Sequence, residues 1–142
     1  MGEIVNGDGY AVGTLDDLGD GPGFRKIRSG FGVTAFGVNA VVIPAGIESG
    51  RHYHDEQEEL YFVHRGELEF VFGDGSERFV LGPGGIARVD PHTIRQIRNT
   101  SDQEAIYVCV GGKDGYVGRD GRAPEGDPGP RARPTDGAGG AG

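Results

Sequence analysis

"GIESGRHYHDEQEELYFVHRG" (residues 46–66) holds three of the chain's four histidines; two of them, His52 and His54, stand two positions apart, and Glu59 follows five residues after His54. Side chains alternate between the two faces of a strand, so both imidazoles are expected to point the same way. If the chain turns back after the acidic loop at residues 55–58, the Glu59 carboxylate faces the same cavity. The same residues could instead form a solvated strand and a solvated acidic loop.

Two histidines and one carboxylate are the ligand set that non-haem Fe(II) favours, and they leave open positions for a substrate. The same set also accepts Zn, Mn, Ni or Cu. The motif therefore indicates one divalent metal ion, and the residues leave the identity of that metal open.

Short β-like runs separated by turn signals make up the middle of the chain. We expect strands at residues 24–28, 33–43, 59–64, 67–72, 77–81, 86–89, 93–98 and 105–110. Residues 73–76 read GDGS, which is a hairpin turn signal between two of these runs. Close spacing of the strands, with no amphipathic helix of three turns, predicts an all-β antiparallel sandwich or barrel.

Glycines at both ends of the histidine stretch complete a wider pattern. Its fixed positions are Gly46, His52, His54, Glu59 and Gly66. This spacing resembles the first motif of the cupin superfamily, and the strand rhythm extends the resemblance more loosely over residues 33–110. The resemblance implies an antiparallel jelly-roll barrel with a metal inside. It also implies that the two histidines and the glutamate are the ligands of Fe, Mn, Zn or Ni.

The second cupin motif usually supplies a fourth ligand, a histidine, from a later strand, and this chain departs from that pattern. The candidate stretch is VDPHTIRQIRN at residues 89–99. Aligning Asn99 with the family's asparagine puts Arg95 where the histidine is expected and His92 at a glycine of the turn. A cation therefore stands in place of the fourth ligand.

Three interpretations of Arg95 stay open. In the first, three protein ligands hold the metal and Arg95 binds an anionic group of the substrate, because a guanidinium donates two parallel hydrogen bonds to a carboxylate or phosphate. Metal binding would then be weakened, since a fixed positive charge repels a divalent cation. In the second, the metal is lost and Arg95 pairs with Glu59 instead. In the third, a bulge lets His92 reach the metal.

The strand that begins at Glu59 presents alternate side chains to the cavity, so His64 is expected to point outward. The expected substrate-binding residues are Arg95, Tyr61, Val63 and Ile97. The single cysteine, Cys109, lies in an apolar run and excludes an internal disulfide framework. We expect it to be a buried structural thiol in a reducing, cytoplasmic compartment.

Composition divides the chain into three parts. Residues 1–23 are expected to form an N-terminal arm, with one helical turn at residues 14–18, and residues 24–117 are expected to form the barrel. Residues 118–142 contain eight glycines and four prolines. They have too little apolar surface to offset their ordering entropy, which predicts a disordered tail.

Charge narrows the choice of partners. The chain has 142 residues and a net charge of −8, and such an acidic surface repels nucleic acid and anionic membranes. No apolar run approaches the ~18 residues of a membrane span. We therefore expect a small-molecule substrate, no nucleic acid and no membrane. The resemblance implies a homodimer formed through barrel faces or exchanged N-terminal strands.

Three functions are compatible with the resemblance. The intact first motif favours a metal-dependent enzyme of the dioxygenase, isomerase, cyclase or lyase type. The altered second motif favours a non-catalytic barrel that binds an organic or sugar acid and has lost its metal. A purely structural barrel is disfavoured, because unpaired polar ligands inside a barrel are costly. No residue selects a particular reaction.

Overall fold

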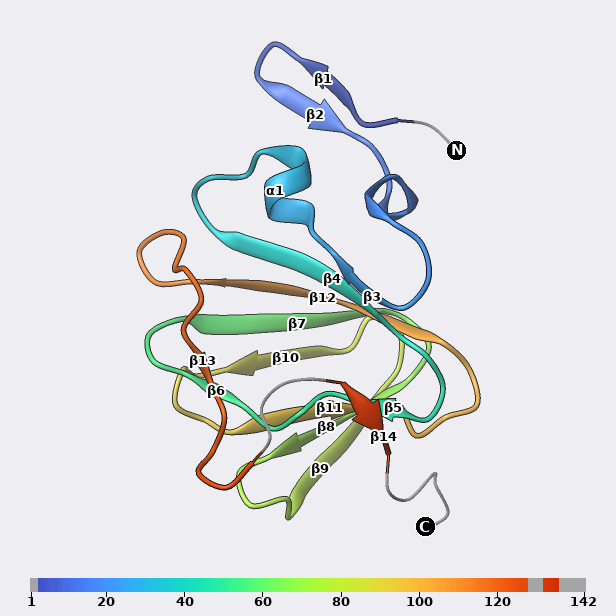
Figure 1. Ribbon diagram of the computed structural model, residues 1–142, viewed down its shortest axis with the longest axis vertical. Helices are drawn as coiled ribbons and strands as arrows, with labels where there is room; N and C mark the ends of the chain where they lie inside the picture. Colours follow the sequence, from blue (N-terminus) through green and yellow to red (C-terminus); the bar gives the residue numbers. More distant parts are fainter. Residues whose placement is uncertain (1–2, 128–131, 136–142) are drawn as a thin grey trace.

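The computed structural model describes residues 3–127 and 132–135 and confirms an all-β antiparallel barrel (Figure 1). Its strands are β1 (Val5–Gly7), β2 (Tyr10–Val12), β3 (Gly23–Arg25), β4 (Gly37–Ile43), β5 (Ile47–Glu48), β6 (Tyr53–His54), β7 (Glu58–Arg65), β8 (Leu68–Phe72), β9 (Glu77–Leu81), β10 (Ile86–Val89), β11 (Arg95–Arg98), β12 (Ala105–Gly112), β13 (Gly121–Arg122) and β14 (Arg133–Pro134). The helical elements are a 3-10 helix, η1 (Leu15–Leu18), and a five-residue α-helix, α1 (Ile27–Phe31). Within the described ranges, no helix has the length and apolar character needed to cross a membrane.

Two five-stranded sheets form the barrel. One has the strand order β10-β7-β12-β4-β3, and the other has the order β14-β5-β11-β8-β9. Successive strands are divided between the sheets: β7 pairs with β10 and β12, whereas β8 pairs with β9 and β11. All of these pairings are antiparallel, and the two-sheet arrangement is that of a jelly roll.

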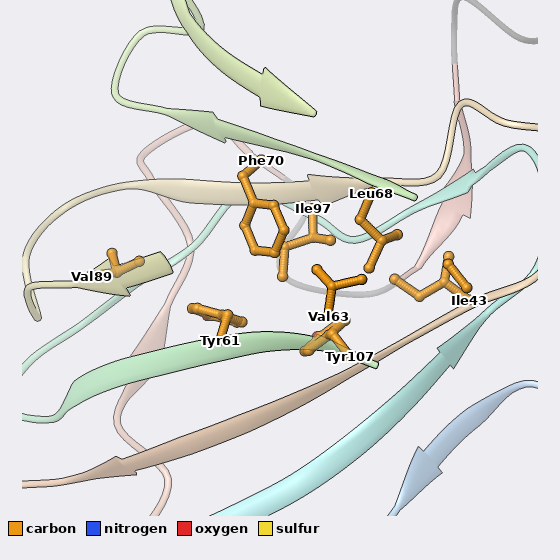
Figure 2. Packing of buried hydrophobic residues seen from close by; sticks show 9 residues of the cluster. Ile43, Tyr61, Val63, Leu68, Phe70, Val89, Ile97 and Tyr107 are labelled. Atoms are coloured by element: carbon orange, nitrogen blue, oxygen red, sulfur yellow. The ribbon is translucent and has the colours of Figure 1, made fainter. Parts of the chain in front are cut away.

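Strand β7 shows how the sequence builds the barrel interior. Glu59, Tyr61 and Val63 are buried, and the residues between them are exposed. His64, which was predicted to point outward, is exposed as well. Figure 2 shows buried side chains from both sheets meeting in one cluster. The cluster consists of Ile43, Tyr61, Val63, Leu68, Phe70, Val89, Ile97, Ala105 and Tyr107. Burying one large apolar side chain of this kind contributes about 1.5–3 kcal/mol.

Most of the predicted strands are confirmed. The runs predicted at residues 77–81 and 86–89 coincide with β9 and β10. The GDGS signal is also confirmed, because residues 73–76 connect β8 to β9 and the strands pair at Phe72 and Glu77.

Two predicted strands differ from the observed ones by more than two residues at one end. The strand predicted at residues 24–28 ends at Arg25, because the helix α1 begins at Ile27. In this helix the Gly30 N–H donates to the Lys26 carbonyl at 3.0 Å. Gly32 then ends this helix in the left-handed conformation, with φ of 76°. The run predicted at residues 33–43 becomes a strand only at Gly37.

The chain ends differ from each other in how they meet the barrel. The N-terminal hairpin β1-β2 lies beside α1 and apart from the two large sheets (Figure 1), and η1 occupies the predicted helical turn. In the segment predicted as a disordered tail, β13 pairs with β6 and β14 pairs with β5. These contacts are backbone ladders and ion pairs, such as Arg133 with Glu48 at 3.0 Å, which an argument from apolar surface does not detect. Residues 128–131 and 136–142 of the predicted tail lie outside the described residues.

Gly66, one of the motif glycines, has φ of 75°, and a Cβ there would lie 2.6 Å from the Glu104 carbonyl oxygen. Gly73 has φ of 63° with no atom within 4 Å of such a Cβ. We expect Gly73→Ala to cost about 1–2 kcal/mol from the left-handed conformation alone, and Gly66→Ala to cost clearly more because the backbone must also move. Urea unfolding of both variants measures this difference. Equal losses would show that the close approach at Gly66 has no energetic effect.

Candidate metal centre

Backbone pairing places the two motif histidines beside the strand that carries Arg95. His52 and Arg95 form an antiparallel bridge, with N–H to carbonyl distances of 3.0 and 2.8 Å. His54 donates its own N–H to the Pro91 carbonyl at 2.7 Å. The two imidazole rings meet edge to face, with centroids 5.2 Å apart. The predicted alternation therefore brings both rings to the interior, although only His54 belongs to β6.

The structure brings the three predicted ligand residues together. One ligand atom from each of His52, His54 and Glu59 lies within 4.8 Å of the other two. His54 and Glu59 are buried and His52 is half-buried. His54 Nε2 is buried without a hydrogen-bond partner in the described part of the chain and lies 3.3 Å from Glu59 Oε1.

The environment sets the charge of each of these groups. Although burial opposes its ionised form, the nearby His54 ring, the hydrogen bond from Tyr61 and the charge of Arg95 lower the pKa of Glu59 to about 2. Burial and the nearby Arg95 lower the pKa of His52 to about 4. Burial also disfavours a charged His54, but the neighbouring carboxylates of Glu59 and Asp120 raise the pKa of that ring above its usual value. At neutral pH the site thus contains an ionised carboxylate and a neutral His52, as metal ligation requires.

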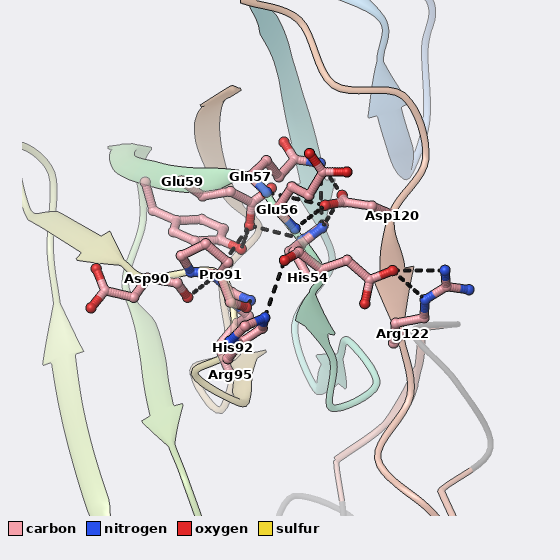
Figure 3. Close-up of polar contacts among 12 residues, drawn as sticks. His54, Glu56, Gln57, Glu59, Asp90, Pro91, His92, Arg95, Asp120 and Arg122 are labelled. Atoms are coloured by element: carbon pink, nitrogen blue, oxygen red, sulfur yellow. Dashed lines mark hydrogen bonds and ion pairs between the residues drawn. The ribbon is translucent and has the colours of Figure 1, made fainter. Parts of the chain in front are cut away.

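Asp120 is a member of this site that the sequence analysis missed (Figure 3). Its Oδ1 lies 2.7 Å from His54 Nδ1, and its Oδ2 accepts the backbone N–H of Glu56 at 2.7 Å. Burial of Asp120 opposes its ionised form, but hydrogen bonds from Gln57 and from the backbone N–H of Glu56 outweigh this effect. They hold the pKa of Asp120 well below its usual range. No motif identified this residue, because it lies in the glycine-rich segment and 66 positions after His54.

Arg95 is enclosed by the barrel and bound mainly to the backbone. It is 1 % exposed, and its guanidinium donates to the carbonyls of Asp90 at 3.1 Å and Pro91 at 3.2 Å. Its Nη2 lies 3.8 Å from Glu59 Oε1, and its Nε has no hydrogen-bond partner within the described residues. Arg95 therefore acts as a fixed positive charge beside the carboxylate.

His92 does not join the three ligand residues. Its side chain is exposed, and Nε2 lies 3.1 Å from the backbone carbonyl oxygen of Asp55. The interpretation in which His92 reaches the metal therefore has no support in the described residues.

The other predicted lining residues lie deeper in the barrel. Tyr61 is 2 % exposed and its hydroxyl donates to Glu59 Oε1 at 2.5 Å. Val63 and Ile97 have no exposed surface and pack in the apolar cluster. Cys109 is opposite Tyr61 in the strand register and packs against the same cluster, and burial raises the pKa of its thiol.

The donor set fits a divalent metal. The Asp120 carboxylate can only accept a hydrogen bond, so Nδ1 of His54 carries a proton and Nε2 is the atom left to act as a ligand. An unpartnered Nε2, an ionised carboxylate and a second imidazole together form a set of two nitrogen ligands and one oxygen ligand.

A family model described as a cupin domain matches residues 39–111, just over half of the chain. The chain belongs to the cupin family. Among solved structures, this cupin resembles a cupin protein from Bacteroides fragilis, with 25% identity and a TM-score of 0.61 over 79% of this chain and 91% of that one. A search of curated proteins found no match.

Two further solved structures extend the comparison. The cupin resembles the DMSP lyase DddQ from Ruegeria pomeroyi, with 28% identity and a TM-score of 0.56 over 65% of this chain and 45% of the lyase chain. More than half of the lyase thus has no counterpart in this comparison. An uncharacterised conserved protein with a double-stranded β-helix domain from Klebsiella pneumoniae shares the fold, at 19% identity and a TM-score of 0.60, over 72% of this chain and 90% of that one.

Removing the Tyr61 hydroxyl tests how Glu59 is stabilised. In chelator-treated protein we expect Tyr61→Phe to lower the free energy of unfolding by about 1.5–3 kcal/mol, because a hydrogen bond to a buried charge is lost. Tyr107→Phe is the matched control, since Tyr107 packs in the same cluster and its hydroxyl makes no hydrogen bond within the described residues. Urea unfolding measures both variants. Equal effects would mean that the Tyr61–Glu59 contact does not stabilise the fold.

Proposed function

We propose that this cupin binds one divalent metal ion, Fe, Mn, Zn or Ni, through His52, His54 and Glu59. The convergence of their three ligand atoms within 4.8 Å is the observation that supports the proposal most strongly. The charge states of the site support it as well, because the carboxylate is ionised and His52 is neutral at neutral pH. A bound ion of this kind would polarise a substrate oxygen or activate O₂.

The proposed activity is that of a small-molecule enzyme of the dioxygenase, isomerase, cyclase or lyase type. The substrate is a small organic molecule, and an anionic one is favoured by the buried positive charge of Arg95. Backbone carbonyls hold the guanidinium in place, so its positive charge would attract an anion electrostatically without any movement of the Arg95 side chain. The resemblance to a DMSP lyase supports an enzymatic role, although it spans only 45% of that chain.

A second function is favoured by the position of Arg95. Its guanidinium is close enough to Glu59, at 3.8 Å, to neutralise the carboxylate without a metal. In that case the barrel would be a non-catalytic module that binds an organic or sugar acid. The two functions differ in what they predict for metal content.

Elemental mass spectrometry of the purified, untagged protein separates the two functions. We expect about one metal ion per chain in the wild type and almost none in His54→Ala, because a two-ligand site binds metal weakly. His64→Ala is the matched control, since this histidine is exposed on the outer face of β7, and its metal content should equal that of the wild type.

The metal content of the Arg95→His variant shows whether Arg95 has replaced the metal ion. If the wild type holds no metal and Arg95→His binds it tightly, the arginine has replaced the ion and the metal-free binding module is the correct function. Absence of metal from both proteins would contradict the assignment of the ligands.

We also propose that the cupin forms a homodimer. The proposal is supported by three exposed apolar side chains on β7 and β10: Leu60, Phe62 and Ile86, which are 42%, 41% and 61% exposed. Phe62 and Ile86 are opposite each other in the β7-β10 strand register. Neighbouring exposed apolar side chains on one sheet face are typical of a surface that another protein covers. A second copy of this chain is the proposed partner.

Light scattering after size-exclusion chromatography tests the dimer. We expect a particle of twice the 14.9 kDa chain mass for the wild type, and a monomer for Phe62→Glu because it places a charge in the proposed interface. Phe79→Glu is the control, since Phe79 is 52% exposed but belongs to the other sheet. A monomeric wild type would contradict the proposal.

A further inference from the structure

We infer that Asp120 is a positioning residue of the metal centre, which fixes the His54 ring so that Nε2 is the ligand atom. The inference rests on the proposed metal-binding function and extends the site to the C-terminal segment. It means that the two five-stranded sheets do not contain the complete site, because residue 120 lies outside both of them, between β12 and β13.

Both oxygens of Asp120 are held in place. Oδ1 contacts His54 Nδ1 at 2.7 Å and accepts from Gln57 Nε2 at 2.6 Å. Oδ2 accepts the backbone N–H groups of Glu56 at 2.7 Å and Gln57 at 3.1 Å. Because the residue is only 7% exposed and its carboxylate makes four polar contacts, the carboxylate cannot rotate away from the imidazole without breaking several hydrogen bonds.

The segment that carries Asp120 has its own attachments to the barrel. Gly121 pairs with His54 in the β13-β6 ladder, and a Cβ at Gly121 would lie 3.5 Å from His54 Cε1, so the backbone lies against the ring. Further along, Arg122 forms an ion pair with Asp55 at 2.7 Å, and Asp127 contacts Arg51 at 3.1 Å. Replacing the Asp120 side chain should therefore leave the segment attached.

The chemical effect of this contact follows from the two nitrogens of the ring. A carboxylate at Nδ1 keeps the proton on that atom, leaves the Nε2 lone pair available and makes Nε2 a more basic ligand. Nε2 is also the atom of His54 that is buried without a hydrogen-bond partner and lies nearest to Glu59. Loss of such an outer carboxylate typically costs 10–100-fold in metal affinity.

Calorimetric titration of the full chain with Zn²⁺ tests the inference. We expect Asp120→Ala to bind Zn²⁺ about 10–100-fold more weakly than the wild type, and Asp120→Asn to be intermediate because its amide oxygen still accepts a hydrogen bond. Asp127→Asn is the matched control: it removes an acidic group of the same segment that contacts Arg51 and not His54, so its affinity should be unchanged. Equal affinity of Asp120→Ala and the wild type would overturn the inference while leaving the proposed metal site intact.

A second measurement is independent of metal. Long-range ¹H–¹⁵N correlation spectra of the chelator-treated protein, recorded where the ring is neutral, report which nitrogen of His54 carries the proton. We expect Nδ1 to carry it in the wild type and in Asp120→Asn, and a mixture of tautomers in Asp120→Ala. A purely structural role would lower the stability of Asp120→Ala without changing the tautomer, and that result would overturn the inference.

The two measurements separate the possible failures. If the wild type binds no Zn²⁺, the proposed metal function fails, and the tautomer alone decides whether Asp120 orients His54. If Asp120→Ala does not fold, the isosteric Asp120→Asn decides: an affinity equal to that of the wild type would overturn the inference, and a graded loss would support it.

Discussion

The polar side chains inside the barrel are arranged around Glu59, because its buried carboxylate must be stabilised in the ionised form. Removing a charge of this size from water costs several kcal/mol unless hydrogen bonds and opposite charges compensate. Here the Tyr61 hydroxyl donates at 2.5 Å, His54 Nε2 lies at 3.3 Å and Arg95 Nη2 lies at 3.8 Å from the same oxygen. One carboxylate oxygen thus connects side chains of β6, β7 and β11.

Arg95 has opposite effects on the two states of this site. Without metal, its charge helps to neutralise Glu59 and lowers the pKa of that carboxyl group. With metal, the same charge would repel the cation, since two positive charges a few ångströms apart interact appreciably even at an effective dielectric of about 20. Because the carbonyls of Asp90 and Pro91 hold the guanidinium, it is not free to move away. We therefore expect the metal to bind less tightly than in a four-ligand cupin, with Asp120 partly compensating through His54.

The sequence predicted the features that depend on local pattern. The spacing of the histidines and the glutamate indicated three side chains on one side of a cavity, and their ligand atoms do converge. The alternation of β7 and the turn before β9 were also readable, because a strand repeats every two residues and a hairpin turn has its own residue preferences.

The features that the sequence did not predict depend on distant partners. Asp120 meets His54 across 66 residues, and Arg133 meets Glu48 across 85. Neither contact buries apolar surface, so a composition argument classified the whole segment as a tail. Alignment with Asn99 predicted Arg95 at the position of the fourth ligand, and its guanidinium lies 3.8 Å from Glu59. Its binding to two backbone carbonyls was not predictable, because it depends on the turn at residues 90–91.

Anomalous diffraction from a crystal of the wild-type chain soaked with Zn²⁺, recorded at the zinc absorption edge, tests directly whether His52, His54 and Glu59 bind a metal. We expect one strong peak inside the barrel, about 2.0–2.2 Å from a nitrogen of His52, from Nε2 of His54 and from a carboxylate oxygen of Glu59. A barrel without a peak at these residues, with the Arg95 guanidinium bonded directly to Glu59, would contradict this expectation.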